Sequence, residues 1–390
     1  MPPTATLAPM MLRLFVSMLA VSASTLARAR DYVALLGTYT DGESRGIYAV
    51  RLNSETGALS TPELVGELSN PEFLALHPNG RIVYALTQVP AAEGKTAGAV
   101  AAFAVEPASG RLTPLNLAST NSGGALTHLA VDATGRMVVA ASYGGGYVVS
   151  FPIEPDGRLG ARASLIPQTG PLGPNRVRQD APHPHSVTLS PDNRFAFVAD
   201  LGLDRVFSYR LAPKDGTIAR NEPASAAIAP GAGPRHSKFS SDGKSFYVLD
   251  ELDGTITSCR YDAARGVVEP FQRVSTLPDG FTGKNTASEI RIHPNGRFVY
   301  AANRGHNSLA VFARDAETGA LTRIEIVACG GEHPRNFALT PDGAWLVCAH
   351  QTSNNLTVFR VNAGTGRLTA TTQTAHAPKP VCVLFLPTPD

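Results

Sequence analysis

The sequence predicts an all-β fold, a seven-bladed β-propeller whose blades are four-stranded antiparallel sheets. Three observations predict it: a turn motif recurs every 47 to 58 residues, each copy lies between short apolar runs, and the two chain ends hold complementary parts of one further unit. Repeats of this length built from four short strands are typical of propellers. The composition agrees, since 36 Gly, 30 Pro and only 17% charged residues accompany no long helical period.

The turn motif reads HPNG, DATG, SPDN, SSDG, HPNG and TPDG. Its last residues are Gly80, Gly135, Asn193, Gly243, Gly296 and Gly343. A strand such as SVTLS precedes each turn and one such as RFAFVAD follows it. A third strand (RVFSYRL, SLAVFAR, LTVFRV), a second turn and a weaker fourth strand come next. Six turns therefore predict six complete antiparallel blades.

The two chain ends supply the seventh blade. The N-terminal runs YVALLGTYT and GIYAVRLN resemble second and third strands with no first strand before them. The C-terminal run VCVLFLP resembles a first strand with nothing after it. We therefore expect residues near 31–52 and 380–387 to share one blade, which closes the ring and removes its open edge. Residues 30–390 would then form a single propeller domain.

Residues 1–29 are predicted to be a secretory signal peptide. Arg13 precedes a short apolar run, and the segment ends in the small-x-small pattern Ala27-Arg28-Ala29. The run is too short and too rich in Ser and Thr to span a bilayer comfortably. We expect cleavage before Arg30, export to the periplasm and no membrane attachment of the mature form.

Charge and cysteine usage narrow the class of ligand. The formal net charge is +2, and no basic tract is interleaved with aromatic residues, so nucleic acid is not an expected partner. The four cysteines, Cys259, Cys329, Cys348 and Cys382, show no zinc-type spacing. We expect a small-molecule ligand with no metal and no cofactor, and the sequence leaves the oligomeric state open.

Loop parity predicts which end of the ring carries function. In an up-and-down blade, the loop before strand 1 and the loop between strands 2 and 3 lie at the same end, and strand 1 lines the central channel. Eight residues before each turn end stand Glu72, Thr127, His185, Arg235, Ser288 and Arg335; eight residues after it stand Gln88, Tyr143, Leu201, Glu251, Arg304 and Gln351. Any one of these side chains could merely cap a loop or pair with a surface carboxylate. As a set they favour a functional mouth, because burying several charges near one axis is unfavourable unless they are paired or used.

The chain resembles the seven-bladed lactonase family that contains bacterial propeller-type 6-phosphogluconolactonases and fungal carboxy-muconate cyclases. The runs that carry the resemblance include GTYTDGESRGIYAVRLNSETGAL, PHPHSVTLSPDNRFAFVADLGLDRVFSYRL, GPRHSKFSSDGKSFYVLDEL and ASEIRIHPNGRFVYAANRGHNSLAVF. The resemblance implies four catalytic positions: His185, Arg235, Glu251 and Arg304. Six polar residues at or near the same columns are further candidates for substrate binding: His128, His183, His236, Glu289, Arg335 and Gln351. The chain departs from its relatives at Thr87-Gln88, where they tend to carry Asn-Glu.

The expected reaction is hydrolysis of a six-carbon sugar δ-lactone, glucono-1,5-lactone or its 6-phosphate. Such a site needs a base for water and donors for the oxyanion. Glu251 or His185 can be the base. The residues favour Glu251, with His185 protonating the leaving oxygen, while Arg235 and Arg304 bind the oxyanion and the product carboxylate. No G-x-S-x-G motif is present, which favours direct attack by water over an acyl-enzyme. Export favours the unphosphorylated lactone. A non-catalytic propeller that binds a ligand or partner, and a muconate-type lactonising cyclase, remain alternatives.

Overall fold

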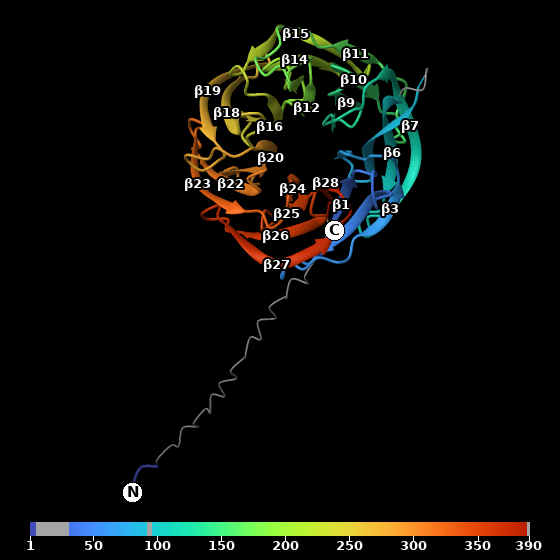
Figure 1. Ribbon diagram of the computed structural model, residues 1–390. Helices are drawn as coiled ribbons and strands as arrows, with labels where there is room; N and C mark the ends of the chain where they lie inside the picture. Colours follow the sequence, from blue (N-terminus) through green and yellow to red (C-terminus); the bar gives the residue numbers. More distant parts are fainter. Residues whose placement is uncertain (5–30, 92–95, 388–390) are drawn as a thin grey trace.

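The protein is a ring of antiparallel sheets. The structure, a computed structural model, describes residues 1–4, 31–91 and 96–387 of the chain. These residues form 28 strands in seven four-stranded antiparallel sheets, arranged as blades around a central axis (Figure 1). The predicted seven-bladed β-propeller is confirmed. Nearly all of the predicted signal peptide lies outside the described residues.

We name each blade by its innermost strand. The β28 blade holds β28 (Pro380–Phe385), β1 (Tyr32–Thr38), β2 (Gly46–Leu52) and β3 (Glu63–Glu67). The β4 blade holds β4 (Leu74–Leu76), β5 (Ile82–Pro90), β6 (Thr96–Val105) and β7 (Leu112–Gly123). The β8 blade holds β8 (His128–Val131), β9 (Met137–Ser142), β10 (Tyr147–Pro152) and β11 (Ser164–Pro167). The β12 blade holds β12 (Pro184–Leu189), β13 (Phe195–Asp200), β14 (Arg205–Ala212) and β15 (Thr217–Ala227).

The remaining three blades follow the same order. The β16 blade holds β16 (Pro234–Phe239), β17 (Ser245–Asp250), β18 (Thr255–Asp262) and β19 (Val267–Ser275). The β20 blade holds β20 (Thr286–Ile292), β21 (Phe298–Arg304), β22 (Ser308–Arg314) and β23 (Leu321–Ala328). The β24 blade holds β24 (Pro334–Leu339), β25 (Trp345–His350), β26 (Asn355–Val361) and β27 (Leu368–His376).

The chain ends close the ring as expected. Strand β1 pairs with β28 in antiparallel register, with Ala34 opposite Phe385 and Leu35 opposite Leu384. The pairing gives both β1 and β28 a neighbour and so leaves no open edge between the two chain ends.

The recurring turns are shaped by side-chain hydrogen bonds. In the β16 blade, the Ser240 hydroxyl donates to Asp242 at 2.6 Å and accepts the Ser245 backbone N–H at 2.9 Å. Gly243 follows at φ +68°, a left-handed conformation that favours glycine. This turn therefore depends on Ser240, Asp242 and Gly243 for its geometry.

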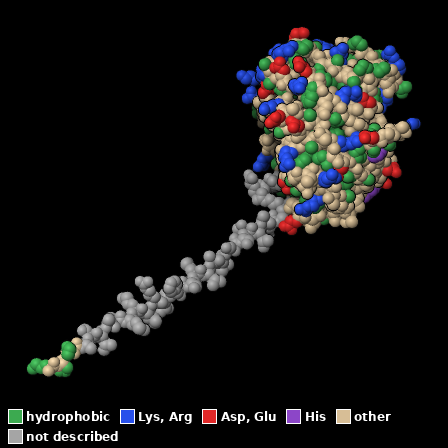
Figure 2. Space-filling model, turned by 90° about the vertical axis from the view of Figure 1, so that its left-hand side faces the viewer, with side chains coloured by type: hydrophobic (Ala, Val, Ile, Leu, Met, Phe, Trp, Pro, Cys, Tyr) green, Lys and Arg blue, Asp and Glu red, His purple; other side chains and the backbone are tan. Residues whose placement is uncertain are grey.

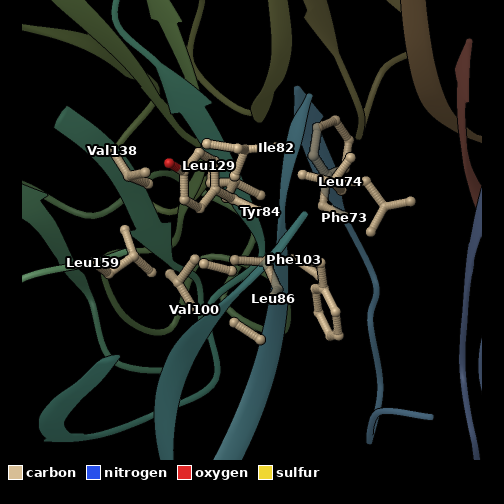
Figure 3. Close-up of a cluster of buried hydrophobic side chains, with 14 of the residues drawn as sticks. Phe73, Leu74, Ile82, Tyr84, Leu86, Val100, Phe103, Leu129, Val138 and Leu159 are labelled. Carbon is tan, nitrogen blue, oxygen red and sulfur yellow. The ribbon is translucent and has the colours of Figure 1, made fainter. Parts of the chain in front are cut away.

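Apolar side chains packed between neighbouring blades form the core. Figure 3 shows Ile82 and Tyr84 of the β4 blade beside Val138 and Leu159 of the β8 blade. The Tyr84 hydroxyl donates to the Gly157 carbonyl at 3.0 Å, so a second strand is tied to the outer turn of the next blade.

The same link recurs around the ring. Tyr247 donates to Gly319 at 2.7 Å and Tyr300 donates to Gly366 at 2.9 Å. The second strands and outer turns therefore contribute a repeated link between neighbouring blades.

The outer surface is mixed in charge. Figure 2 shows Lys, Arg, Asp and Glu side chains interspersed over one side of the ring. Among the residues that the structure describes, no helix is long and apolar enough to cross a membrane.

Candidate active site

A polar cavity of about 400 Å³ lies where the seven inner strands begin. Every blade contributes to its lining, either before its innermost strand or after its second strand. The lining includes Tyr39, Glu72, Thr127, Tyr143, Arg178, His185, Glu251, Arg304 and Arg335. Seven of these nine belong to the two columns found in the sequence, all but Tyr39 and Arg178, so the parity argument placed them at the correct end of the ring.

Bulges in the inner strands bring consecutive residues to the axis. The β16–β17 register shifts between Pro234 and His236, and the same kind of shift occurs in β12, β20 and β24. A bulge inserts an extra residue and re-aims side chains. Arg235 therefore reaches the mouth while its neighbour His236 lies deeper in the channel.

Glu251 is the centre of a buried ion-pair cluster. Its Oε2 accepts hydrogen bonds from Arg235 Nε at 2.8 Å and lies 2.9 Å from Arg304 Nη2, while its Oε1 accepts from Arg178 Nη2 at 2.5 Å. The Glu251, Arg235 and Arg304 side chains are only 3%, 2% and 6% exposed. Both carboxylate oxygens are therefore already engaged by cationic donors.

The arginines fix the protonation state of this cluster. Burial by itself would raise the pKa of Glu251, but the charges of Arg304 and Arg235 outweigh it and hold that pKa well below its usual value. Burial, together with the charge of Arg304, lowers the pKa of Arg235 to about 9, so the guanidinium stays charged at neutral pH. Glu251 is an ionised carboxylate with little basicity left.

His185 is the uncommitted acceptor of the site. Its Nε2 lies 3.9 Å from Glu251 Oε2, too far for a hydrogen bond, and neither ring nitrogen bonds to any residue that the structure describes. Burial, reinforced by the charge of Arg235, lowers the pKa of His185 well below its usual value, so the ring is neutral at pH 7. On geometry, His185 is the better-placed candidate for the base, because both oxygens of Glu251 are engaged by guanidinium groups; the residues alone pointed to Glu251.

Arg178 is one of two lining residues that the sequence analysis missed, Tyr39 being the other. Arg178 lies in the connection between β11 and β12, and its side chain is 35% exposed above Glu251. Gln179 anchors this connection by donating to the Leu201 carbonyl at 2.9 Å. The one available signal was length, because the spacing of 58 residues across this connection is the longest between turn motifs.

Two aromatic residues, Tyr39 and Tyr143, also line the cavity. Tyr39 donates to Glu72 Oε2 at 3.0 Å, and the Arg335 guanidinium lies 5.3 Å from the centre of the Tyr39 ring. Tyr143 stacks on His183 with ring centres 4.2 Å apart. Burial raises the pKa of Glu72 and raises that of Tyr39 to about 12, so the phenol keeps its proton as a donor.

Several predicted binding residues lie away from the cavity lining. His128, His236 and Glu289 are buried deeper in the channel, where the two imidazole centres are 5.2 Å apart and His236 Nδ1 lies 3.3 Å from Glu289. His183 lies on the rim, bonded to Asp180 and to the Tyr143 carbonyl. Gln351 does not line the cavity. The structure thus gathers His185, Arg235, Glu251, Arg304 and Arg335 at the mouth and separates the other candidates from it.

A family model described as "Lactonase, 7-bladed beta-propeller" matches residues 33–385. The chain belongs to the seven-bladed β-propeller lactonase family. The expected resemblance and the expected enzyme class, a lactonase, are confirmed.

Relatives of this lactonase cover almost the whole chain. It is 39% identical over 355 residues to a 6-phosphogluconolactonase of Bacillus subtilis, an alignment that spans 91% of this chain and 98% of that protein. Its fold matches the periplasmic gluconolactonase of Pseudomonas aeruginosa with a TM-score of 0.86 and 32% identity, over 92% of this chain and 100% of that one. A putative 6-phosphogluconolactonase of Bacteroides fragilis matches with a TM-score of 0.83 and 33% identity, over 92% and 98% of the two chains.

For a lactonase, the mouth offers a neutral imidazole, buried guanidinium groups and an excess of positive charge. Four guanidinium groups, those of Arg178, Arg235, Arg304 and Arg335, stand against two carboxyl groups. Among the described residues, no group of three or more His, Cys, Asp or Glu side chains is arranged to hold a metal ion. Cys259, Cys329, Cys348 and Cys382 are free thiols buried in the blades.

Proposed function

We propose that this lactonase hydrolyses a six-carbon sugar δ-lactone, glucono-1,5-lactone or its 6-phosphate, to the aldonate. The observation that carries the proposal is the juxtaposition of His185, which has no hydrogen-bond partner among the described residues, with buried guanidinium groups held by Glu251. Hydrolysis of a lactone needs both a base and cationic donors, because the attacking water must lose a proton while the carbonyl oxygen gains negative charge.

Water attacks the lactone carbonyl carbon as His185 takes one of its protons. The carbonyl π electrons move to oxygen, and Arg304 and Arg178 stabilise that oxyanion. Glu251, 3.9 Å from the His185 ring, stabilises the imidazolium that forms. When the intermediate collapses, the bond between the carbonyl carbon and the ring oxygen breaks, and the imidazolium gives its proton to that oxygen. The product is an aldonic acid, which ionises and leaves as a carboxylate.

Each guanidinium contributes through its fixed planar fork. Arg304 donates Nη2 to the Ala287 carbonyl at 3.0 Å and Nε to the Thr286 carbonyl at 3.3 Å, so its orientation is set before substrate binds. A preoriented donor to an oxyanion lowers the barrier by about 2.7–4 kcal/mol in enzymes of acyl transfer. The free lactone and its phosphate share this chemistry and differ only at the far end of the substrate.

Two pairs of observations point to different substrates. The predicted signal peptide and the likeness to a periplasmic gluconolactonase support export and the unphosphorylated lactone. The relative from Bacillus subtilis and the excess of positive charge at the mouth support the 6-phosphate. We favour glucono-1,5-lactone in the periplasm, because phosphorylated sugars are cytoplasmic metabolites.

The deciding experiment measures acid release from each lactone in a pH-stat, with spontaneous hydrolysis subtracted. We expect a higher kcat/KM for glucono-1,5-lactone than for its 6-phosphate. The opposite ranking would overturn the choice of substrate. No acceleration of either lactone would overturn the hydrolase proposal and leave a ligand-binding propeller or a lactonising cyclase.

A further inference from the structure

The central channel has a second cavity at the end opposite the mouth. Its volume is about 590 Å³, and all seven innermost strands contribute to its lining. Residues of the recurring turns, such as Pro294 and Pro341, lie at its rim. The walls are largely aliphatic, with Val187, Leu339 and Leu384 among them.

A plug of aromatic rings separates this lower cavity from the mouth. Phe73 packs on His128 with ring centres 4.0 Å apart, and His236 contacts both rings at 5.9 and 5.2 Å. Between the two cavities remains a space of only about 10 Å³, lined by Phe73, His185 and His236 among others. That space is at most enough for one water molecule, so a ligand of the lower cavity would not reach the mouth.

One repeat position that lines the lower cavity carries different residue types in different blades, which a purely structural role does not require. Five residues before each turn end stand Ala75, Ala130, Thr188, Lys238, Arg291 and Ala338, all of which line this cavity. Four of the six are small residues. Two neighbouring blades instead carry a cation, and this departure puts two positive side chains on the same wall.

Within the described part of the chain, only one of these cations has a partner. Arg291 Nε donates to the Phe337 carbonyl at 3.2 Å, and Arg291 Nη2 lies 3.5 Å from Glu289. Lys238 makes no hydrogen bond or ion pair with any described residue. Burial, together with the charge of Arg291, lowers the pKa of Lys238 to about 8, as expected for an ammonium group without a compensating anion. Two cations against one carboxylate leave an excess of one positive charge.

We propose that the lower cavity is a second binding site, for a small monoanion that joins a carboxylate to a short aliphatic chain. The carboxylate would accept a charge-assisted hydrogen bond from the Lys238 ammonium, and the chain would lie against Val187, Leu339 and Leu384. A ligand site of this kind combines apolar walls with one or two convergent polar groups. The proposal does not depend on the reaction at the mouth.

Octanoate is a suitable probe, titrated into the purified protein by isothermal calorimetry. We expect Lys238→Met, which keeps the length of the side chain and removes its charge, to weaken octanoate binding about tenfold or more. The matched control is Lys244→Met, an exposed lysine in a turn at the same end of the ring, which should bind as the unaltered protein does. Lys238→Met should also keep its lactone turnover, because Lys238 lies beyond the plug.

Two further measurements test whether octanoate binds in the lower cavity or at the mouth, and whether its charge or its apolar chain determines the affinity. Arg304→Gln alters only the mouth and should leave octanoate affinity within about twofold. Octanol and octyltrimethylammonium should bind the unaltered protein at least about tenfold more weakly than octanoate. Equal affinity of octanol and octanoate would overturn the proposal, and this comparison needs no variant to fold. Octanoate binding that Arg304→Gln abolishes and Lys238→Met preserves would overturn it too.

Discussion

Replacing Glu251 by glutamine tests the whole ion-pair cluster at the mouth. The change keeps the size of the side chain and removes the charge that Arg178, Arg235 and Arg304 share. A glutamine can accept through its oxygen, but its NH2 group must face an N–H donor. Breaking a buried ion pair by removing one partner costs about 3–5 kcal/mol, because a charge is left buried without compensation.

The same change should lower kcat even under conditions in which the variant is fully folded. Without the carboxylate, the imidazolium of His185 loses the negative charge 3.9 Å away, and the guanidinium groups lose their common anchor. Loss of acid–base assistance is worth about 10²–10⁴-fold in rate. We therefore expect Glu251→Gln to lower kcat for glucono-1,5-lactone at least about a hundredfold at a temperature where the variant is fully folded.

The matched control is Glu325→Gln, the same chemical change in the outermost strand of the β20 blade. Glu325 pairs with Arg367 and accepts the Leu368 backbone N–H at 2.7 Å, so its loss should lower stability without touching the mouth. Stability is measured by guanidinium unfolding and turnover by pH-stat. Full turnover in Glu251→Gln, or an equal loss in Glu325→Gln, would refute the assignment of the site.

Three other predictions follow from the same structure. Arg304→Lys should lower kcat/KM about a hundredfold, since a point charge cannot replace a guanidinium fork, whereas Arg314→Lys at the opposite end should not change it; equal effects would contradict the role of Arg304. Unfolding free energy should fall as pH drops below about 6.5, because burial lowers the pKa of His128, His185 and His236 and only the unfolded chain then takes up protons. Guanidinium titrations that agree at pH 7.5 and 5.5 would contradict this. Export predicts a mature protein that begins near Arg30 and is found in the periplasmic fraction; an intact mass that includes residues 1–29 on the soluble protein of the native host would count against it.

The sequence predicted those residues of the candidate site that occupy equivalent positions in the repeated blades. His185, Arg235, Glu251 and Arg304 could be brought together because equal positions in successive blades lie at equal heights around one axis. His128, His236 and Glu289 were grouped with them because each follows a column residue in the sequence and was expected to lie at the mouth beside it. In β16 and β20, which hold His236 and Glu289, register shifts instead place residues that are one step apart at different depths.

The other features of the candidate site, which are Arg178, Tyr39 and the choice of base, depend on contacts that cannot be inferred from equivalent positions in the repeat. Arg178 lies in a connection outside the repeat, and Tyr39 follows the first strand of the divided blade, which has no turn motif of its own before it. The choice of base depends on which groups occupy the oxygens of Glu251. That choice needed the three arginine contacts, one of which comes from Arg178.

The two ends of the channel show why one ring can carry two different polar sites. Blades are held to each other by second strands and outer turns, as in the bonds from Tyr84, Tyr247 and Tyr300. Several inner-strand residues face the channel axis, as Ala75, Lys238 and Arg291 do, and a charge placed there loses hydration that some partner must replace. At the mouth, Glu251 offsets that loss for Arg235 and Arg304. At the lower cavity Lys238 has no such partner among the described residues, and a bound anion would stabilise it.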